Sequence, residues 1–243
     1  MDKMDLLVKD LVSWLKVHVE GAGGKGLVFG LSGGVDSAVM AAISKLAFPD
    51  TSLGIIMPCY SDPRDKEDAL LVADALDLKT QVVDLGPVFD IFIKQLKLQK
   101  SKLAEANLKP RLRMSTLYYY AQNLNYLVAG PTNKSEFHVG YFTKHGDSGV
   151  DLLPLANIVK EDIWNMARYL KVPEPIIEKT PTAGLWEDQN DEEEMGFSYK
   201  LLDKFLRTGK GPENIIEKID KMNITSSHKR KFPPIYKYHN LVD

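Results

Sequence analysis

The sequence predicts an α/β fold, a doubly wound and mainly parallel sheet with helices on both faces. Short apolar runs alternate with segments of helical spacing between about residues 26 and 140, which is the pattern of a parallel sheet covered by crossover helices. A glycine-rich stretch at 30–37 joins the first apolar run to the next helix. We expect one domain, residues 1–243, with a sheet core at about 26–140 and substrate loops, helices and a basic tail at about 141–243.

The local pattern supports each element in chain order. Leu7, Leu11 and Leu15 have helical spacing, and Asp62 followed by Pro63 has the order of an N-cap and a first helical residue. Helical spacing predicts helices at 4–19, 35–46, 62–76, 87–98, 111–123, 160–170 and 192–206. Apolar runs predict strands at 27–31, 53–57, 80–83 and 126–130. Polar or Pro/Thr-rich composition predicts surface stretches or loops at 99–110, 141–157 and 173–191.

Composition excludes several classes of protein. The formal net charge of −2 gives no overall field toward nucleic acid or a membrane. The single cysteine, Cys59, rules out an internal disulfide and a cysteine-based metal cluster. The first residues are not those of a signal peptide, and no apolar run approaches the length of a membrane span. We therefore expect a cytoplasmic protein that binds neither nucleic acid nor membrane.

The glycine-rich stretch carries the first functional prediction. It consists of Gly30, Leu31, Ser32, Gly33, Gly34, Val35, Asp36 and Ser37. Glycines let a backbone approach a phosphate closely, and a helix N-terminus offers free N–H groups. Asp36 stands where a Walker loop has lysine, and a carboxylate beside a polyphosphate suits a bound Mg²⁺. The alternative is an ordinary glycine turn in which Asp36 and Ser37 are first-turn helix residues.

The loop resembles that of the N-type ATP pyrophosphatases, and later motifs narrow the resemblance to the ammonia-dependent NAD synthetases. These motifs are Arg111-Leu112-Arg113-Met114, Asn133-Lys134-Ser135-Glu136, Gly140-Tyr141-Phe142-Thr143-Lys144, Gly146-Asp147, Asp151-Leu152-Leu153-Pro154-Leu155, Pro181-Thr182-Ala183-Gly184-Leu185-Trp186 and His228-Lys229-Arg230. The likeness runs from about residue 26 to 233. It implies a fold like that of the adenine nucleotide α-hydrolases.

The resemblance also implies a reaction. ATP activates the nicotinic acid carboxylate of deamido-NAD as an acyl-adenylate and releases pyrophosphate, and ammonia then displaces AMP to give NAD. A carboxylate needs this activation because hydroxide is a poor leaving group. The two reactants are both anions, so Mg²⁺ and lysine side chains are expected to neutralise their charge.

The family pattern assigns residues to ATP and to the metal. Asp36 and Glu136 are the expected Mg²⁺ ligands, and each follows a predicted strand, so they are expected to converge at one edge of the sheet. ATP is assigned to residues 30–37 and to Thr132, Lys160 and Thr182. The family usually has a threonine where this chain has Pro131, which leaves open whether Thr132 or a backbone group makes that contact. Without the resemblance, Glu136 is a first-turn helix acid, Lys160 an exposed helix-start lysine and Thr182 a turn residue.

A second set is assigned to deamido-NAD and to the chemistry. The family positions that contact deamido-NAD are Arg111, Lys144, Asp151, His228 and Lys229. Cationic partners suit the pyrophosphate and the ring carboxylate of this substrate. Asp147 is a candidate for steering ammonia, and together with Lys160 it is the expected catalytic pair. Taken alone, these residues read as a solvated helix end, loop residues and a basic surface tail.

The resemblance implies a homodimer whose subunits share the substrate site. The helix face with Leu117, Tyr118, Ala121 and Leu124 is one candidate for the subunit contact, and burial in the chain's own core is an equally good interpretation. Free ammonia is the expected nitrogen donor, unless a separate glutaminase supplies it. We expect 99–110 and 184–191 to be mobile without ligand.

Four other functions compete with this interpretation. A GMP synthetase would share the loop and Asp36 but would bind xanthosine monophosphate. A tRNA thiolase fits less well, because those enzymes commonly use catalytic cysteines and Cys59 is alone. A non-catalytic adenine-nucleotide-binding regulator belongs to a different class, and a nucleic-acid-binding module built on residues 228–231 has the least support.

Overall fold

The computed structural model describes residues 3–96, 101–182, 184, 186 and 189–236. Its sheet has four parallel strands in the order β3-β2-β1-β4. The strands are β1 (Leu27–Gly30), β2 (Ser52–Ile56), β3 (Thr80–Val82) and β4 (Leu127–Val128). The predicted parallel α/β fold is confirmed, although β4 is shorter than the predicted strand.

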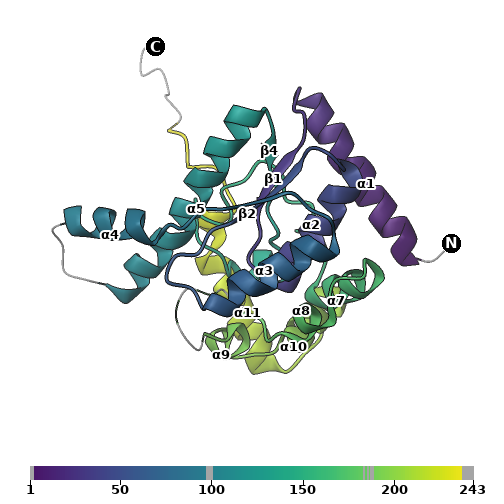
Figure 1. Ribbon diagram of the computed structural model, residues 1–243. Coiled ribbons are helices and arrows are strands. Elements are labelled where there is room, and N and C mark those ends of the chain that lie inside the picture. Colours follow the sequence, from purple (N-terminus) through teal and green to yellow (C-terminus); the bar gives the residue numbers. More distant parts are fainter. Residues whose placement is uncertain (1–2, 97–100, 183, 185, 187–188, 237–243) are drawn as a thin grey trace, which may run out of the picture.

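Helices cover both faces of the sheet, as predicted (Figure 1). Leu27 and Phe29 of β1 point to one face, where they join one core with side chains from the first helices and from the region after residue 155. Val28 and Ile55 point to the other face. The first core is covered by α1 (Lys3–Gly21), α2 (Val35–Ala47), α3 (Pro63–Ala75), α7 (Lys160–Tyr169) and α8 (Glu174–Glu178). The second is covered by α4 (Gly86–Gln95) and α5 (Lys102–Leu124).

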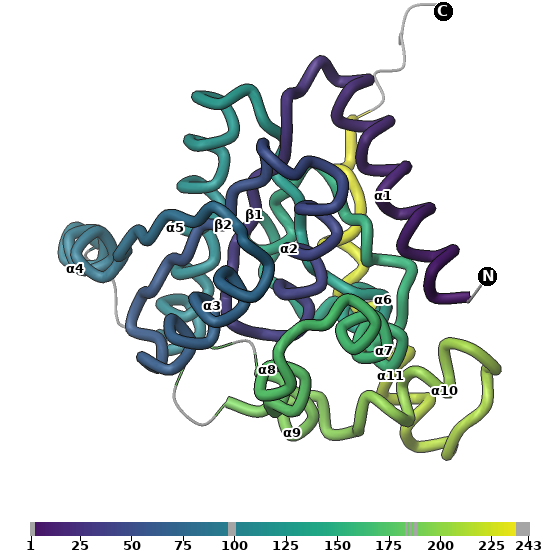
Figure 2. The backbone as a smooth tube through the Cα atoms, turned by 45° about the vertical axis from the view of Figure 1, so that its right-hand side comes forward, coloured from purple at the N-terminus to yellow at the C-terminus, as the bar shows by residue number. Residues whose placement is uncertain are grey.

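A third apolar cluster lies beyond the sheet. Phe197, Tyr199, Leu202 and Ile219 form its centre with Met195. It is built from α6 (Lys134–Val139), α9 (Asp191–Met195), α10 (Tyr199–Thr208) and α11 (Glu213–Thr225), and the 3-10 turn Ser227–Lys229 follows α11. In Figure 2, α8, α9 and α10 lie together below the sheet. Because α6 directly follows β4, this cluster reaches the carboxyl end of the sheet, where the site is built.

Three predictions about the elements are wrong, and local chemistry explains two of them. The predicted surface stretch 99–110 is helical from Lys102, because Ser101 caps the helix and Pro110 is accommodated within it. Residues 97–100 lie outside the described residues. The predicted helix 192–206 is two helices, since Gly196 ends α9 at φ +73° and Ser198 caps α10. The predicted loop 173–191 contains α8, and α11 was not predicted.

The predicted start of α3 is confirmed. The Asp62 carboxylate accepts a hydrogen bond from the Arg64 N–H at 2.9 Å, and Pro63 is the first helical residue. No helix in the described part of the chain combines the length and apolar character needed to cross a bilayer. Of the predicted mobile segment 184–191, residues 185, 187 and 188 lie outside the described residues.

Candidate active site

The glycine loop runs from the end of β1 into α2, as predicted. Its two serines are hydrogen-bonded to each other, with 3.0 Å between Ser32 Oγ and Ser37 Oγ. Ser37 Oγ also donates to the Gly34 carbonyl oxygen at 2.8 Å. Gly34 is the N-cap of α2 and contributes no side-chain cap. The loop therefore presents backbone N–H groups and hydroxyls at the carboxyl edge of the sheet, which suits an anion.

Gly33 is required by both conformation and space. Its φ is +81°, and a Cβ at this position would lie 2.6 Å from the Asp65 carbonyl oxygen and 2.7 Å from Asp68 Cβ. The loop can therefore pack against α3 only with glycine here. Lys179, at the end of α8, pairs with the same turn of α3, at 2.9 Å from Asp65 and 2.5 Å from Asp68.

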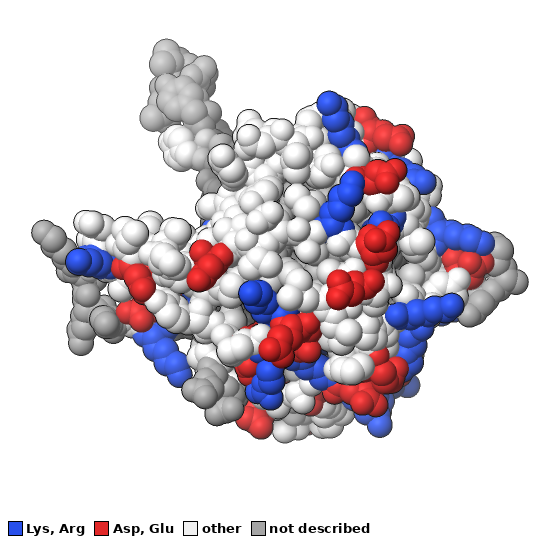
Figure 3. Space-filling view, in the orientation of Figure 1, with Lys and Arg blue, Asp and Glu red and all other residues white. Residues whose placement is uncertain are grey.

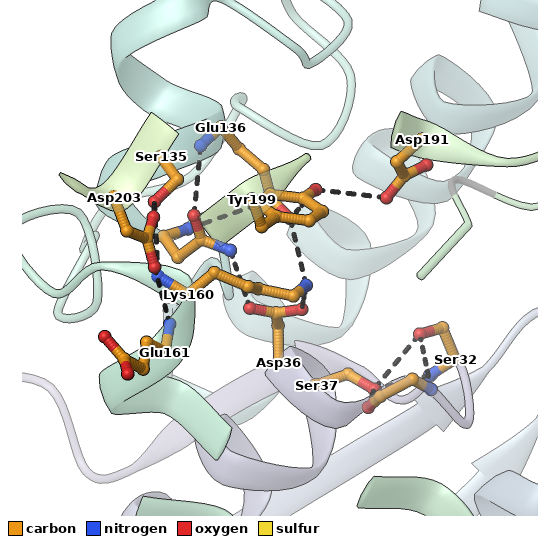
Figure 4. A network of polar contacts seen from close by, with 12 residues as sticks. Ser32, Asp36, Ser37, Ser135, Glu136, Lys160, Glu161, Asp191, Tyr199 and Asp203 are labelled. Atoms are coloured by element: carbon orange, nitrogen blue, oxygen red, sulfur yellow. Dashed lines mark hydrogen bonds and ion pairs between the residues drawn. The ribbon is translucent and has the colours of Figure 1, made fainter. Parts of the chain in front are cut away.

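Asp36 and Glu136 converge on the ammonium of Lys160 (Figure 4). Lys160 Nζ lies 2.5 Å from Asp36 Oδ2 and 3.5 Å from Glu136 Oε1. The side chains of Lys160, Asp36 and Glu136 are 2%, 17% and 15% exposed. The two carboxylates follow β1 and β4, which are neighbours in the sheet, so the predicted convergence is confirmed. Lys160 is buried and ion-paired, which excludes the alternative of an exposed helix-start lysine.

Burial and charge shift the titration of this centre. Burial and the charge of Asp36 raise the pKa of Glu136 to about 8, against the opposing effect of Lys160. Burial lowers the pKa of Lys160, but the charges of Asp36 and Glu136 outweigh it and raise the value above the ordinary one. The ammonium thus stays charged at neutral pH and opposes the effect of Asp36 on the pKa of Glu136.

Asn133 joins the two carboxylates and was not predicted. Its Nδ2 donates to Asp36 Oδ1 at 2.8 Å, and its Oδ1 accepts from the Glu136 N–H at 3.0 Å. The Glu136 carboxylate accepts in return from the Asn133 N–H at 3.2 Å, which completes a capping box at the start of α6. The Asn-x-x-Glu spacing is the sequence signal that could have revealed this residue.

Tyr199 and Asp191 complete the network and were also not predicted. The Tyr199 ring lies beneath the ammonium of Lys160, with 4.9 Å from Nζ to the ring centroid. Its hydroxyl is 3.1 Å from Asp191 Oδ2 and 3.4 Å from Glu136 Oε1. Both residues come from the third cluster, α9 and α10, so only the folded chain brings them to this centre.

The donor set fits Mg²⁺. Asp36 and Glu136 supply hard carboxylate oxygens that converge on one point, which the Lys160 ammonium contacts. Within the described residues, no group of three or more histidine, cysteine, aspartate or glutamate side chains could hold a metal by itself. Mg²⁺ commonly uses one or two carboxylates and takes its remaining ligands from water and substrate phosphates. Asp36 and Glu136 would therefore hold it together with a nucleotide.

The two predicted threonines lie on separate loops. Thr132 is buried between β4 and α6, next to Asn133. Thr182 is exposed, and its hydroxyl accepts the Gly184 N–H at 3.1 Å. These contacts leave the ATP assignments of both residues as predictions.

The residues predicted for deamido-NAD gather mostly around the loop that follows α6. Arg111 donates to the Lys144 carbonyl oxygen at 3.3 Å, and Asp147 accepts from the Thr143 N–H at 2.8 Å. The Lys229 ammonium donates at 2.8 Å to the carbonyl oxygens of two residues of this segment, Gly140 and Phe142. Arg111, Lys144, Asp147 and Lys229 are thus brought to one loop.

Two further positions lie apart from these contacts. His228 is exposed in the 3-10 turn after α11. Asp151 accepts from the Tyr118 hydroxyl at 3.0 Å and from the Val128 N–H at 2.8 Å. The Asp151 carboxylate therefore links α5 to β4 through two hydrogen bonds.

Comparison with known proteins decides among the ATP pyrophosphatase families. A sequence profile of the NAD synthase family matches residues 7–233. The chain belongs to the NAD synthase family. It is 53% identical to the NH3-dependent NAD+ synthetase of Carboxydothermus hydrogenoformans over 93% of this chain and 94% of that protein. This NAD synthase assignment favours neither the GMP synthetases nor the tRNA thiolases.

Solved structures of the NAD synthase family match the fold closely. An NMN synthetase from Francisella tularensis superimposes with a TM-score of 0.94 at 34% identity, covering 98% of this chain and all of that one. An NH3-dependent NAD synthetase from Campylobacter jejuni gives a TM-score of 0.81 at 30% identity, with the same coverage. The likeness therefore extends over both the sheet and the third cluster.

Proposed function

We propose that this chain amidates deamido-NAD to NAD with ammonia and ATP, releasing AMP and pyrophosphate through an acyl-adenylate. The enzyme is then a ligase that forms a C–N bond. The observation that carries the proposal is the Asp36–Lys160–Glu136 centre beside the glycine loop, in a chain of the NAD synthase family. A non-catalytic nucleotide sensor has no need of a carboxylate pair at this point.

ATP binding is assigned to the carboxyl edge of the sheet. The loop of residues 30–37 holds the phosphates with its N–H groups and hydroxyls, and Asp36 and Glu136 hold Mg²⁺, which neutralises phosphate charge. Lys160 lies against Asp36 of the loop, so its ammonium is within the same site as the α-phosphate assigned there. Thr132 and Thr182 complete the ATP set.

The acceptor is assigned to the neighbouring loop. Arg111, Lys144 and Lys229 bring positive charge to one segment, which suits the anionic deamido-NAD. His228 and Asp151 extend this surface. Asp147, whose carboxylate accepts the Thr143 N–H in this loop, is assigned to steering ammonia toward the activated carboxyl carbon.

Free ammonia is the nitrogen donor in this proposal. Cys59 is fully buried, and burial raises the pKa of its thiol, so it lacks the accessible thiolate that a glutamine-cleaving nucleophile needs. We place the enzyme in the cytoplasm, where a free thiol persists.

A homodimer is part of the proposal, with a revised contact surface. Leu117 and Ala121 are buried in the chain's own core, so this part of the predicted contact face on α5 already packs within the chain. Four neighbouring apolar residues remain exposed on α4: Val88, Ile91, Phe92 and Leu96. In Figure 3 the upper part of the surface at the left, where Figure 1 places α4, is white, and charged side chains lie along its lower edge. The exposed face of α4 is therefore the better candidate for the subunit contact.

The Francisella tularensis structure supports one second candidate, amidation of nicotinate mononucleotide to NMN. This acceptor is deamido-NAD without its AMP half, so the same ATP site and ring-carboxylate chemistry would serve both. The two functions differ only in what the acceptor surface recognises.

One experiment tests the proposal. The purified protein is incubated with Mg-ATP, ammonium and either deamido-NAD or nicotinate mononucleotide, and NAD or NMN is measured with AMP and pyrophosphate. We expect NAD to form one-for-one with AMP, and both to be lost in Asp36→Ala. If NMN forms faster than NAD, the acceptor is nicotinate mononucleotide and not deamido-NAD. If no AMP forms with either acceptor, the proposal is refuted.

A further inference from the structure

Helix α7, which carries Lys160 as its first residue, begins without a local cap. Its N-cap is Val159, whose side chain makes no capping hydrogen bond. The first N–H groups of a helix have no partner within the helix and need acceptors from elsewhere. Here the Glu161 N–H donates to Asp203 Oδ2 at 2.8 Å, and the Lys160 N–H donates to Ser135 Oγ at 3.2 Å. The cap thus comes from other parts of the chain.

Asp203 is one of these two acceptors and is hydrogen-bonded to the other, Ser135. Its side chain, on α10, is 2% exposed, and its Oδ1 accepts the Ser135 hydroxyl at 2.5 Å. Ser135 therefore donates to Asp203 while it accepts from Lys160. Because Ser135 precedes Glu136 in α6, one buried carboxylate joins the starts of α6 and α7 (Figure 4).

The same helix also touches the ammonium. Tyr199 and Asp203 are four residues apart in α10 and lie on one face of it. Tyr199 places its ring 4.9 Å from Lys160 Nζ, while Asp203 accepts from the Glu161 N–H, in the peptide group that follows Lys160. Helix α10 therefore contacts both the ammonium of Lys160 and the backbone next to it.

We propose that Asp203 is a positioning residue for ATP activation. It holds the Glu161 N–H directly and, through the Ser135 hydroxyl, the Lys160 N–H and the start of α6, so that the Lys160 ammonium and the Glu136 carboxylate face one nucleotide. This inference rests on the proposed function for the role of Lys160. Holding α7 against α10 does not by itself call for a buried acid, because Arg207 of α10 already pairs with Glu161 and Asp162 on the surface.

The test measures Mg-ATP binding by calorimetry, without an acceptor, in a double-mutant cycle of Asp203→Asn and Lys160→Met. Asparagine keeps the size of the side chain but removes its charge and replaces one acceptor oxygen with an amide NH2, which can accept from neither the Ser135 hydroxyl nor the Glu161 N–H. We expect Asp203→Asn to raise the Kd for Mg-ATP about tenfold, the effect of losing one hydrogen bond to a charged group. In the Lys160→Met background the same change should raise the Kd by a smaller factor, because only the contribution through α6 and Glu136 remains.

Controls separate positioning from general stability. Arg207→Gln removes the exposed link between the same two helices and should leave the Kd for Mg-ATP unchanged. Ser135→Ala removes the hydroxyl that links the Lys160 N–H to Asp203 and leaves Asp203 in place. It serves as the second variant should Asp203→Asn fail to fold. In turnover, the KM for ATP should rise for Asp203→Asn while the KM for the acceptor stays constant.

The outcomes are distinct. An equal loss of ATP affinity in both backgrounds, or a lower melting temperature with unchanged affinity, would overturn the inference. ATP binding that follows the expected cycle in a protein that makes no NAD would leave the inference standing and refute the acceptor. A wild-type chain that binds no Mg-ATP would overturn both.

Discussion

Replacing Lys160 with methionine should destabilise the fold through the two carboxylates that remain. Methionine keeps the apolar stem but removes the charge that lies 2.5 Å from Asp36 and 3.5 Å from Glu136. Removing one partner of a buried ion pair costs about 3–5 kcal/mol. Because the two carboxylates are 17% and 15% exposed, water relieves part of this penalty, and we expect a loss of about 3 kcal/mol at pH 8.

The loss should depend on pH with a defined sign. The pKa of Glu136 is raised from 4.5 to about 8 in the folded state, so between these values the unfolded chain releases a proton that the folded chain keeps. The free energy of unfolding therefore falls as pH rises through this window, by up to about 1.4 kcal/mol per pH unit. Lys160 lowers the pKa of Glu136, so Lys160→Met should extend the fall to higher pH. The difference between the two proteins should then be smaller at pH 5 than at pH 8.

Urea unfolding followed by circular dichroism at pH 5 and pH 8 measures both effects. Lys179→Met is a matched control, because Lys179 also bridges two aspartates, Asp65 and Asp68, but with all three side chains about a quarter exposed. It should cost about 1 kcal/mol or less at either pH. Equal losses for the two variants, or a Lys160→Met loss that does not grow with pH, would refute the reasoning.

Three further outcomes are expected. Gly33→Ala should lower the free energy of unfolding by about 3 kcal/mol, because the strain of a positive φ adds to overlap of the new Cβ with Asp65. Gly23→Ala is the control: its φ has the same sign but the space around it is open, so it should cost about 1 kcal/mol. Equal melting temperatures for the two variants would contradict this. Asn133→Asp removes the donor to Asp36 and adds a third negative charge, so kcat/KM for ATP should fall about tenfold or more; an unchanged value in a coupled AMP assay would count against the network. Chelation by EDTA should stop AMP formation and added Mg²⁺ should restore it, and turnover that persists in EDTA would remove the metal from the proposal.

The sequence was sufficient for the parallel sheet and for the charged centre. Alternation in β1, with Phe29 on one face and Val28 on the other, follows directly from a period of two. Asp36 and Glu136 were assigned from the family resemblance, and their convergence was predicted because each follows a strand and parallel strands bring their carboxyl ends to one edge.

What the sequence did not reveal depends on tertiary contacts. Polar composition predicted a surface stretch at 99–110, yet α5 begins at Lys102 and continues through Pro110, since packing on the sheet outweighs one lost backbone hydrogen bond. Tyr199 and Asp203 contact residues far away in the chain, and no local spacing relates them to Glu136 or Lys160. Asn133 was the exception, because its capping-box spacing was readable.

The remote cap of α7 has a consequence for the order in which the chain becomes competent. During synthesis Asp36 and Glu136 leave the ribosome before Lys160, and Asp203 follows last of the four. At about 5–20 residues per second, several seconds separate the carboxylates from the helix that finally fixes their counter-ion. We therefore expect the two acids to lack a fixed counter-ion until α7 and α10 are in place, so the proposed nucleotide site is complete only after the C-terminal helices have docked.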